Sequence, residues 1–282
     1  MSVTKQELEN FLAELKKISK YDFTDYSVKS ITRRVEKLLA DNNMPLEGIM
    51  QKMKKDPAFL NKIVKDITVN TTELFRDPKV WNTLKYHILP KYQNSNEIAI
   101  WHPGCSSGQE VYSMIILLNE LGLLSKAVVY GTDINEDMIN DAKRGVYKVR
   151  FKPEYFENFD NVLNETIDNP DTHNKIPYEK YMEINKSNDS ITMLPFLRQK
   201  PKFFVHDLVK DGNVFDIKFD IIMCRNVLIY FNNALQNKVF ELFYDCLKED
   251  SYLIIGLHES IIGYMSDKFI KNGLFYIKKS YN

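Results

Sequence analysis

The 282-residue sequence lacks a surplus of either charge, because Lys plus Arg and Asp plus Glu both number 38. Binding to nucleic acid usually requires a basic surplus, so this balance argues against nucleic acid as the main partner. No apolar run approaches the roughly 20 residues that span a bilayer. The start, MSVTKQELENF, has neither the apolar segment of a signal peptide nor the Arg-rich pattern of a transit peptide. The sequence therefore predicts a protein that is not inserted into a membrane.

Cysteine and histidine are also scarce. The three cysteines, Cys105, Cys224 and Cys246, show no Cys-x-x-Cys spacing, which favours a reduced, cytoplasmic setting. The five histidines are scattered, without a His-x-x-x-His pair or a Cys/His cluster. A structural zinc site is therefore not expected, and we assign no metal ligands.

The first part of the chain, residues 1–68, is predicted to be a small helical domain, because its apolar residues recur at helical spacing. Residues 1–65 hold 13 basic and 9 acidic side chains, a net charge of +4 in a chain that is neutral as a whole. Residues 69–96 form a connecting segment. In it, Asp77 before Pro78 predicts a helix start, with Asp as the cap and Pro in the first turn. The stretch NTTELFR then lies just ahead of that helix.

From residue 97 to residue 282, apolar runs of four to eight residues alternate with helical patterns. This alternation predicts an α/β domain with a Rossmann-like, mostly parallel sheet covered on both faces. An Asn-Gly pair in FIKNGLFYIKK predicts a closing hairpin and hence an antiparallel last strand. Residues 151–202 break the alternation and are interpreted as an inserted, small antiparallel β-subdomain, with KYMEI and SITML as strands.

The stretch GCSSG, residues 104–108, allows two interpretations, because a strand, a tight turn and a helix suit both a serine nucleophile and a cofactor loop. For a serine hydrolase, Ser106, Asp220 and His258 occur in the right order. Against it, the chain upstream is helical, and Asp220 starts its strand, whereas a triad acid needs the strand's carboxyl end. The hydrolase remains as a remote alternative.

A cofactor loop requires an acidic residue at the end of the next strand, and Asp133 stands 25 positions after Gly108. Its two oxygens can accept from two ribose hydroxyls, although it could also cap the next helix. The loop is not Gly-x-Gly-x-x-Gly, so a dinucleotide is less expected than S-adenosylmethionine. In this interpretation Gly104 and Gly108 let the cofactor approach, Glu110 contributes to the site, and Ser106 is a bystander.

Several segments together resemble the CheR-type chemotaxis receptor methyltransferases. They are NTTELFRDP, WHPGCSSGQEVYS, GTDINEDMINDAKRGVY, FDIIMCRNVLIYF and YLIIGLHES, in the family's order. Two departures are visible: Gln109 and Val111 replace the usual Glu and Pro, and Asp207 stands where Asn is common. The resemblance implies that S-adenosyl-L-methionine is the cofactor and S-adenosyl-L-homocysteine the product. It implies cofactor contacts by Asn70, Thr72, Arg76, Gly104, Glu110, Asp133, Asp207, Leu208, Arg225 and Asn226, and places Arg76 and Tyr230 at the reacting groups.

Structural roles are the alternatives for three of these residues. Arg76 could only pair with Asp77 or Glu73, Tyr230 could be a core aromatic, and Glu110 could only favour the first turn of its helix.

The expected activity is methylation of glutamate carboxylates on chemoreceptors, which serves chemotactic adaptation. A second hypothesis is a sensor or scaffold that binds the cofactor without turnover. Expected partners are cytoplasmic receptor helices, through Arg33, Arg34 and Lys37 of the basic module, and a receptor tail on the inserted subdomain. We expect a monomer.

Overall fold

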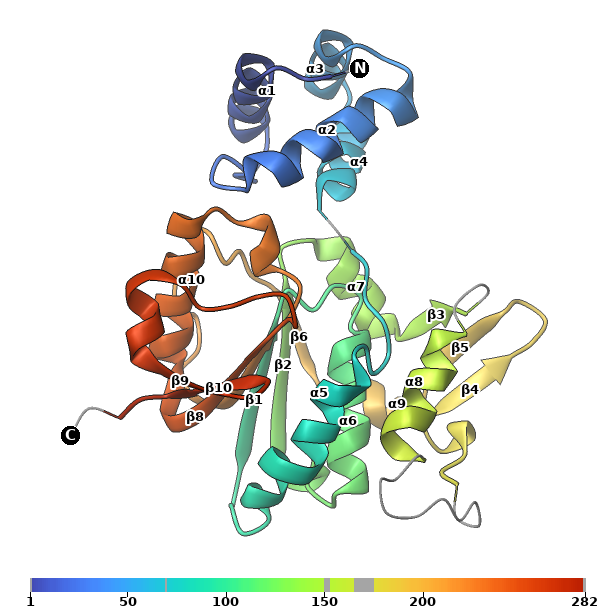
Figure 1. Cartoon of the computed structure of the whole chain (residues 1–282). Coiled ribbons are helices and arrows are strands. Elements are labelled where there is room, and N and C mark those ends of the chain that lie inside the picture. Colours follow the sequence, from blue (N-terminus) through green and yellow to red (C-terminus); the bar gives the residue numbers. More distant parts are fainter. Residues whose placement is uncertain (1, 69, 150–152, 165–174, 281–282) are drawn as a thin grey trace.

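The computed structural model describes residues 2–68, 70–149, 153–164 and 175–280. It consists of a small helical module that lies against one end of a larger α/β body (Figure 1). The helices of the module are α1 (Lys5–Ile18), α2 (Val28–Asn42), α3 (Leu46–Lys55) and α4 (Pro57–Ile67). Their apolar stripes enclose a core of their own that includes Phe11, Leu15, Val35 and Ile63. The helical spacing of the sequence therefore predicted this region correctly.

The connecting segment runs along the α/β body and leads into α5 (Pro78–Thr83), a single π-helical turn (Leu84–Ile88) and a 3-10 turn (Leu89–Tyr92). The helix begins at Pro78 as predicted, but the predicted capping role of Asp77 is wrong. Asp77 has a left-handed backbone with φ of 58° and makes no side-chain cap. Its carboxylate forms an ion pair with the buried guanidinium of Arg225 instead.

The main sheet has seven strands in the order β6-β2-β1-β7-β8-β10-β9. Their bounds are β1 (Ile98–Pro103), β2 (Ala127–Asp133), β6 (Lys202–Val205), β7 (Phe219–Cys224), β8 (Leu247–Ile255), β9 (Phe269–Asn272) and β10 (Phe275–Lys278). The first five are parallel, whereas β10 runs antiparallel to β8 and β9. The predicted antiparallel ending is confirmed, with the turn at the Asn-Gly pair.

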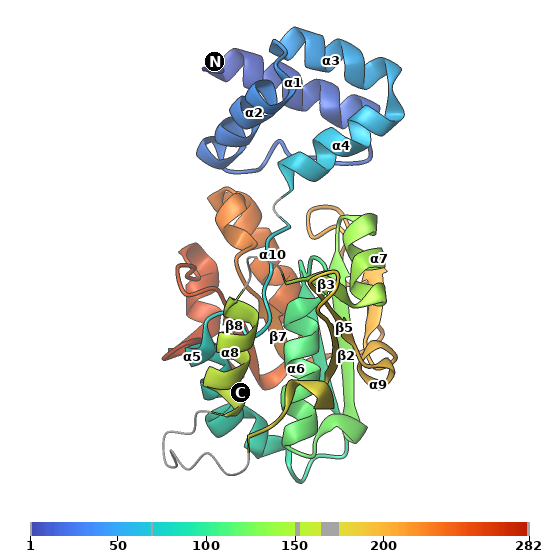
Figure 2. The same cartoon turned by 90° about the vertical axis from the view of Figure 1, so that its right-hand side faces the viewer.

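Both faces of the sheet are covered, which explains the continuous apolar runs of its central strands. On β1, Ile98 and Ile100 pack on one side with α6 (Gln109–Glu120), and Ala99 and Trp101 pack on the other with α10 (Asn233–Cys246). Figures 1 and 2 show these two helices on opposite sides of the strands. A further helix, α7 (Glu136–Arg144), follows β2.

The insertion forms a three-stranded antiparallel sheet in the order β3-β5-β4, beside the main body (Figure 1). Its strands are β3 (Val146–Lys148), β4 (Met182–Asn185) and β5 (Ser190–Met193), with helices α8 (Glu154–Leu163) and α9 (Pro195–Arg198) and a 3-10 turn (Tyr178–Lys180). The predicted β-subdomain is thus confirmed, although β3 precedes residue 151, where we placed its start. Within the insertion, residues 150–152 and 165–174 lie outside the described residues.

The chain order places a switch point between β1 and β7. After β1, the chain adds β2 and β6 on one side and then crosses to β7 on the other. In parallel α/β sheets, ligands bind outside the carboxyl ends of the strands at such a point. The part of the chain that the structure describes also contains 3-10 turns at Leu124–Lys126, Leu228–Tyr230 and Gly263–Lys268. Among the described residues, none of the helices combines the length and apolarity needed to cross a bilayer.

Candidate functional site

A pocket of about 1000 Å³, its open mouth included, lies at the carboxyl ends of β1, β2, β6 and β7. Apart from Gly108, the site residues predicted from the sequence all line it: Asn70, Thr72, Arg76, Gly104, Glu110, Asp133, Asp207, Leu208, Arg225, Asn226 and Tyr230. They come from four strand ends and from the connecting segment. The fold therefore brings together residues that are up to 160 positions apart in the sequence.

The loop after β1 makes the floor of this pocket. Gly104 has φ of +69°, and a Cβ at this position would lie 2.5 Å from Cγ2 of Val227, so neither the backbone nor the packing tolerates a side chain. Gly108 has φ of +89° but does not line the pocket. A Cβ there would lie 2.8 Å from Cβ of Ala142 on α7. The predicted role of Gly108 in admitting a cofactor is therefore wrong, because it serves the packing of two helices.

Asp133 ends β2 and ties the loop to this strand. One carboxylate oxygen accepts from the backbone N–H of Ser106 at 2.8 Å and the other from that of Asn135 at 2.9 Å. Asn135, not Asp133, caps α7, so the capping alternative for Asp133 does not hold. Burial raises the pKa of the Asp133 carboxyl, although these hydrogen bonds oppose the shift. A ligand that donates hydrogen bonds to its free lone pairs would stabilise the buried charge.

Asp207 and Leu208 follow β6 on the same side of the pocket. The Asp207 carboxylate accepts from the backbone N–H of Val209 at 2.8 Å, and its own N–H donates to the Asp211 carboxylate at 2.8 Å. Burial raises the pKa of the Asp207 carboxyl as well. Two buried acidic groups, Asp133 and Asp207, therefore lie at one end of the pocket, where donors such as hydroxyl or amino groups would bind favourably.

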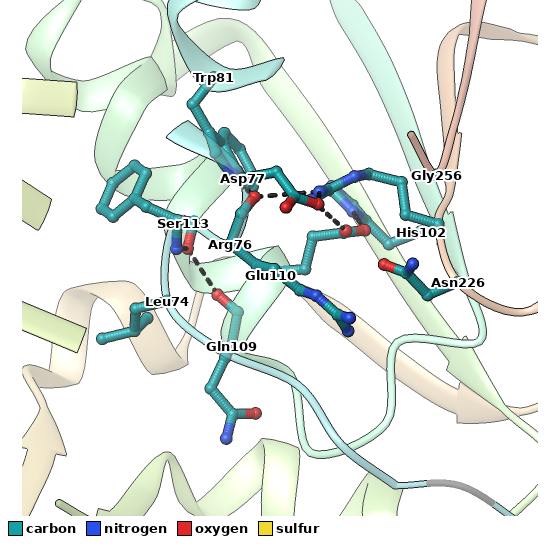
Figure 3. Close-up of polar contacts among 12 residues, drawn as sticks. Leu74, Arg76, Asp77, Trp81, His102, Gln109, Glu110, Ser113, Asn226 and Gly256 are labelled. Atoms are coloured by element: carbon teal, nitrogen blue, oxygen red, sulfur yellow. Dashed lines mark hydrogen bonds and ion pairs between the residues drawn. The ribbon is translucent and has the colours of Figure 1, made fainter. Parts of the chain in front are cut away.

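A buried ionic network, which the sequence did not predict, lies at the other end (Figure 3). The guanidinium of Arg225 is 1% exposed and pairs with Glu110, at 3.2 Å, and with Asp77. Glu110 also bonds to Nδ1 of the fully buried His102 at 2.9 Å. Glu110 does lie in the first turn of α6, but its carboxylate is held by two partners. The Arg225 side chain thus fixes the position of the Glu110 carboxylate, which lines the pocket.

The backbone of Arg76 is fixed by the same network. Its carbonyl accepts from Nη2 of Arg225 and from Nε1 of Trp81, both at 3.0 Å. The Arg76 side chain points away from this carbonyl into the pocket that Glu110 and Asn226 also line (Figure 3). Within the described residues we find no ion pair for its guanidinium. The alternative that Arg76 pairs with Asp77 or Glu73 is therefore wrong for this structure, in which Asp77 pairs with Arg225.

Glu259 holds the loop from Asn226 to Tyr230 in place through hydrogen bonds. The sequence did not predict a role for this residue. Its carboxylate accepts from the backbone N–H groups of Gly256, Asn226 and Ile229, at 2.6, 3.0 and 3.1 Å. A Cβ at Gly256 would lie 2.7 Å from this carboxylate, which explains the glycine. The only signal in the sequence was the position of Glu259 just after β8, in the stretch YLIIGLHES.

We expect Glu259→Ala to lower the free energy of unfolding by about 2 kcal/mol, because it leaves the partly buried backbone amides of Gly256 and Asn226 and the exposed amide of Ile229 without their acceptor. Urea unfolding followed by circular dichroism measures this loss. Glu241→Ala is the matched control, since the Glu241 carboxylate accepts one bond, from the exposed Tyr264 hydroxyl. Equal stability losses in the two variants would contradict a special role for Glu259.

The three residues of the alternative hydrolase triad do not lie together. The Ser106 hydroxyl donates to the carbonyl of Asn70 at 3.2 Å. Asp220 lies at the opposite end of the sheet, where it accepts from the backbone N–H of Ala99 at 2.8 Å, and His258 is exposed in the loop after β8. Cys105 beside Ser106 is no substitute nucleophile, because burial raises the pKa of its thiol and keeps it protonated.

We therefore expect Ser106→Ala to change cofactor affinity and turnover by less than about fivefold, because the partly buried hydroxyl makes only weak contacts, with the Asn70 carbonyl and the Met138 sulfur. Calorimetric titration with S-adenosylhomocysteine, the product that the sequence resemblance implies, and an assay of the implied methyl transfer measure the two quantities. Covalent labelling of Ser106 by a fluorophosphonate would contradict this prediction and favour the hydrolase.

The three cations proposed for partner binding do not share one face of α2. Arg33 and Lys37 are exposed. Arg34 is half-buried, lies with its Cζ 4.6 Å from the centre of the Tyr230 ring, and donates to the carbonyl of Ile67 at 2.7 Å. Tyr230 itself is half-buried at the pocket rather than in the core.

Comparison with known proteins places these features in context. The chain matches the family model described as CheR methyltransferase, SAM binding domain, over residues 70–158 and 170–275. A Pseudomonas putida protein that carries the name Cher3 is 33% identical over 251 residues, which are 88% of this chain and 87% of that protein. A chemotaxis protein methyltransferase of Borreliella burgdorferi is 32% identical over 225 residues, which are 75% of this chain and 71% of that protein. Among solved structures, the magnesium protoporphyrin IX methyltransferase of Synechocystis with bound SAM aligns with a TM-score of 0.36 and 15% sequence identity. The alignment covers 71% of this chain and 76% of that chain.

Proposed function

The chain belongs to the CheR methyltransferase family, whose cofactor is S-adenosyl-L-methionine, and from this premise we propose that it methylates glutamate carboxylates of chemoreceptors in the cytoplasm. The products are glutamate methyl esters and S-adenosyl-L-homocysteine, and the reaction serves chemotactic adaptation. The observation that carries this proposal is the guanidinium of Arg76, which points into the pocket beside Glu110 without an ion pair among the described residues. It offers a carboxylate two parallel hydrogen bonds.

The pocket has donors and acceptors that suit this cofactor. Asp133 keeps free lone pairs for the ribose hydroxyls, and Glu110 presents negative charge for a cationic group. Asn70, Thr72, Asp207, Leu208 and Asn226 complete the contacts, with Gly104 leaving space beside them. When bound, the cofactor supplies an electrophilic methyl group on a positively charged sulfur.

The reaction requires positioning more than proton transfer. A glutamate side chain is already ionised near pH 7, so the site needs no general base. Arg76 orients either the substrate carboxylate or the carboxylate of the cofactor, and the network around Arg225 holds its backbone in place. Tyr230 positions either partner through its ring or hydroxyl, on a loop that Glu259 fixes. Because opposite charges disappear as the ester forms, the buried lining of the pocket favours the step over water.

The partner of the helical module is, in this proposal, an acidic receptor helix. Arg33 and Lys37 are one helical turn apart on the exposed face of α2 and suit glutamate-rich helices. Arg34 contributes from the pocket side, beside Tyr230. A receptor tail can pair with an edge strand of the small sheet, β3 or β4. The protein acts as a monomer.

Incubation with methyl-labelled cofactor and purified cytoplasmic receptor fragments from the same cell tests the function. We expect labelled methyl esters that alkali releases as methanol. If no fragment is labelled although calorimetry shows cofactor binding, the enzyme assignment fails and the sensor hypothesis takes its place. Labelling that resists alkali would contradict ester formation.

A further inference from the structure

His102 is a buried polar residue to which the sequence assigned no role in the site. It lies near the carboxyl end of β1 and is 0% exposed. Side chains alternate between the two faces of a strand, so His102 shares its face with Ile98 and Ile100, which pack in the hydrophobic core. A central strand that is buried on both faces usually carries apolar side chains at such positions, so the imidazole requires an explanation.

The polar contact of the His102 ring is with Glu110, whose side chain lines the pocket. Nδ1 lies 2.9 Å from Oε1 of Glu110, and Figure 3 shows the two residues in the ionic network. An ionised carboxylate only accepts hydrogen bonds, so Nδ1 carries the proton and donates it. Among the described residues Nε2 has no partner, and a second proton on it would be a buried donor without an acceptor. The contacts therefore favour a neutral imidazole that donates to Glu110.

Two different donors hold the two oxygens of the Glu110 carboxylate. Oε1 accepts from His102, and Oε2 accepts from Nη1 of Arg225 at 3.2 Å. The last torsion of a glutamate side chain has a broad energy minimum, so one hydrogen bond does not fix the plane of the carboxylate, whereas two bonds to different oxygens do. Each oxygen keeps a lone pair for a ligand. His102 therefore helps to determine how these lone pairs face the pocket.

S-adenosylmethionine has two cationic groups, and one of them can use these lone pairs. The sulfonium carries charge but no hydrogen on sulfur, whereas the protonated α-amino group donates charge-assisted hydrogen bonds. S-adenosylhomocysteine retains the amino group and lacks the sulfonium charge. Two ligands that differ only in the amino group therefore report on the Glu110 carboxylate and on the residues that orient it.

We propose that His102 is a positioning residue that fixes the plane of the Glu110 carboxylate and thereby sets the preference of the site for a ligand with an α-amino group. The inference rests on the proposed function, in which Glu110 presents negative charge to a cationic group of the cofactor. His102 does not line the pocket, so its effect on the ligand passes through Glu110. A carboxylate that is already oriented loses little freedom when the ligand binds, which lowers the cost of binding.

The test is calorimetric titration of full-chain variants with two ligands, S-adenosylhomocysteine and its analogue in which hydrogen replaces the amino group. His102→Leu fills the buried site but cannot donate to Glu110, so we expect it to raise the dissociation constant of S-adenosylhomocysteine about tenfold. The dissociation constant of the analogue should change by less than about twofold. His102→Asn should recover most of the affinity, because its amide nitrogen is as many bonds from Cα as Nδ1 of His102 and can donate in its place.

Two further variants separate positioning from a general loosening of the strand. Ile100→Ala is the matched control, because Ile100 lies on the same face of β1, is fully buried and does not line the pocket. It should leave the ratio of the two dissociation constants as in the wild type. His102→Gln places its amide nitrogen as far from Cα as Nε2 and not Nδ1, so it should show the same selective loss as His102→Leu. It keeps the test available if thermal unfolding shows that His102→Leu does not fold.

Equal losses of affinity for both ligands in the Leu and Gln variants would overturn the proposal, because a distorted pocket would then explain the effect. Unchanged affinity for S-adenosylhomocysteine in these variants would overturn it too, as would an Asn variant that binds as weakly as the Leu variant. The readout is binding. A wild type that binds S-adenosylhomocysteine but methylates no receptor fragment would therefore count against the proposed function and leave this inference intact.

Discussion

Arg76→Ala should lose about 100-fold or more of kcat/KM for methyl transfer, because preorganised charge aimed at reacting groups commonly contributes that much. The variant should fold normally, since the Arg76 contacts that the structure describes are made by its carbonyl, which the substitution retains. Initial rates with labelled cofactor and a receptor fragment measure the loss. Calorimetry with S-adenosylhomocysteine separates weaker cofactor binding from weaker substrate placement.

The Arg76→Lys variant tests whether the planar guanidinium, and not only its charge, is needed for methyl transfer. Lysine keeps the charge but not the planar fork, so a bidentate role predicts a loss nearly as large as that of alanine. Lys79→Ala is the matched control, because Lys79 is exposed on the next turn and does not line the pocket. Activity within threefold of the wild type in both Arg76 variants would rule out a role for this guanidinium at the reacting groups.

Arg225→Met should lower the free energy of unfolding by about 3 kcal/mol, because the substitution leaves the carboxylates of Glu110 and Asp77 without their buried cation. The estimate is at the low end for a broken buried pair, since the side chain of Asp77 is 30% exposed and water can partly solvate it. Urea unfolding measures the change. Cofactor affinity should fall at the same time, because Glu110 and the carbonyl of Arg76 lose their common donor.

Arg144→Met supplies the control for this second prediction. Arg144 also pairs with an aspartate, Asp141, but its side chain is 65% exposed on α7. Exposed pairs contribute little, so this variant should lose less than about 0.5 kcal/mol. If Arg225→Met proves as stable as Arg144→Met, the ionic network does not hold the pocket together.

Local signals in the sequence predicted most of the fold. The apolar runs of the central strands, the helical spacing before residue 68 and the Asn-Gly pair before β10 each act on neighbouring residues, so their outcome could be foreseen. The same holds for the pocket. Parallel strands bring their carboxyl ends to one edge, and motif residues after β1, β2, β6 and β7 therefore line one cavity.

Other expectations failed because distant contacts decided them. Asp77 looked like a helix cap, but the guanidinium of Arg225, 148 positions away, is its partner. Gly108 looked like part of the cofactor loop, but its missing side chain makes room for Ala142. Glu259 gave no signal beyond its place after a strand, yet its carboxylate accepts from three backbone amides.

By itself the sequence determined the kinds of elements, their order and the edge of the sheet where the pocket lies, because periodicity and turn chemistry depend on residues close together in the chain. The tertiary structure alone decided which charges pair, which glycine faces the pocket and which carboxylate holds the loop after β7. Those contacts depend on how whole faces pack, and packing joins residues whose separation in sequence carries no information about their distance in space.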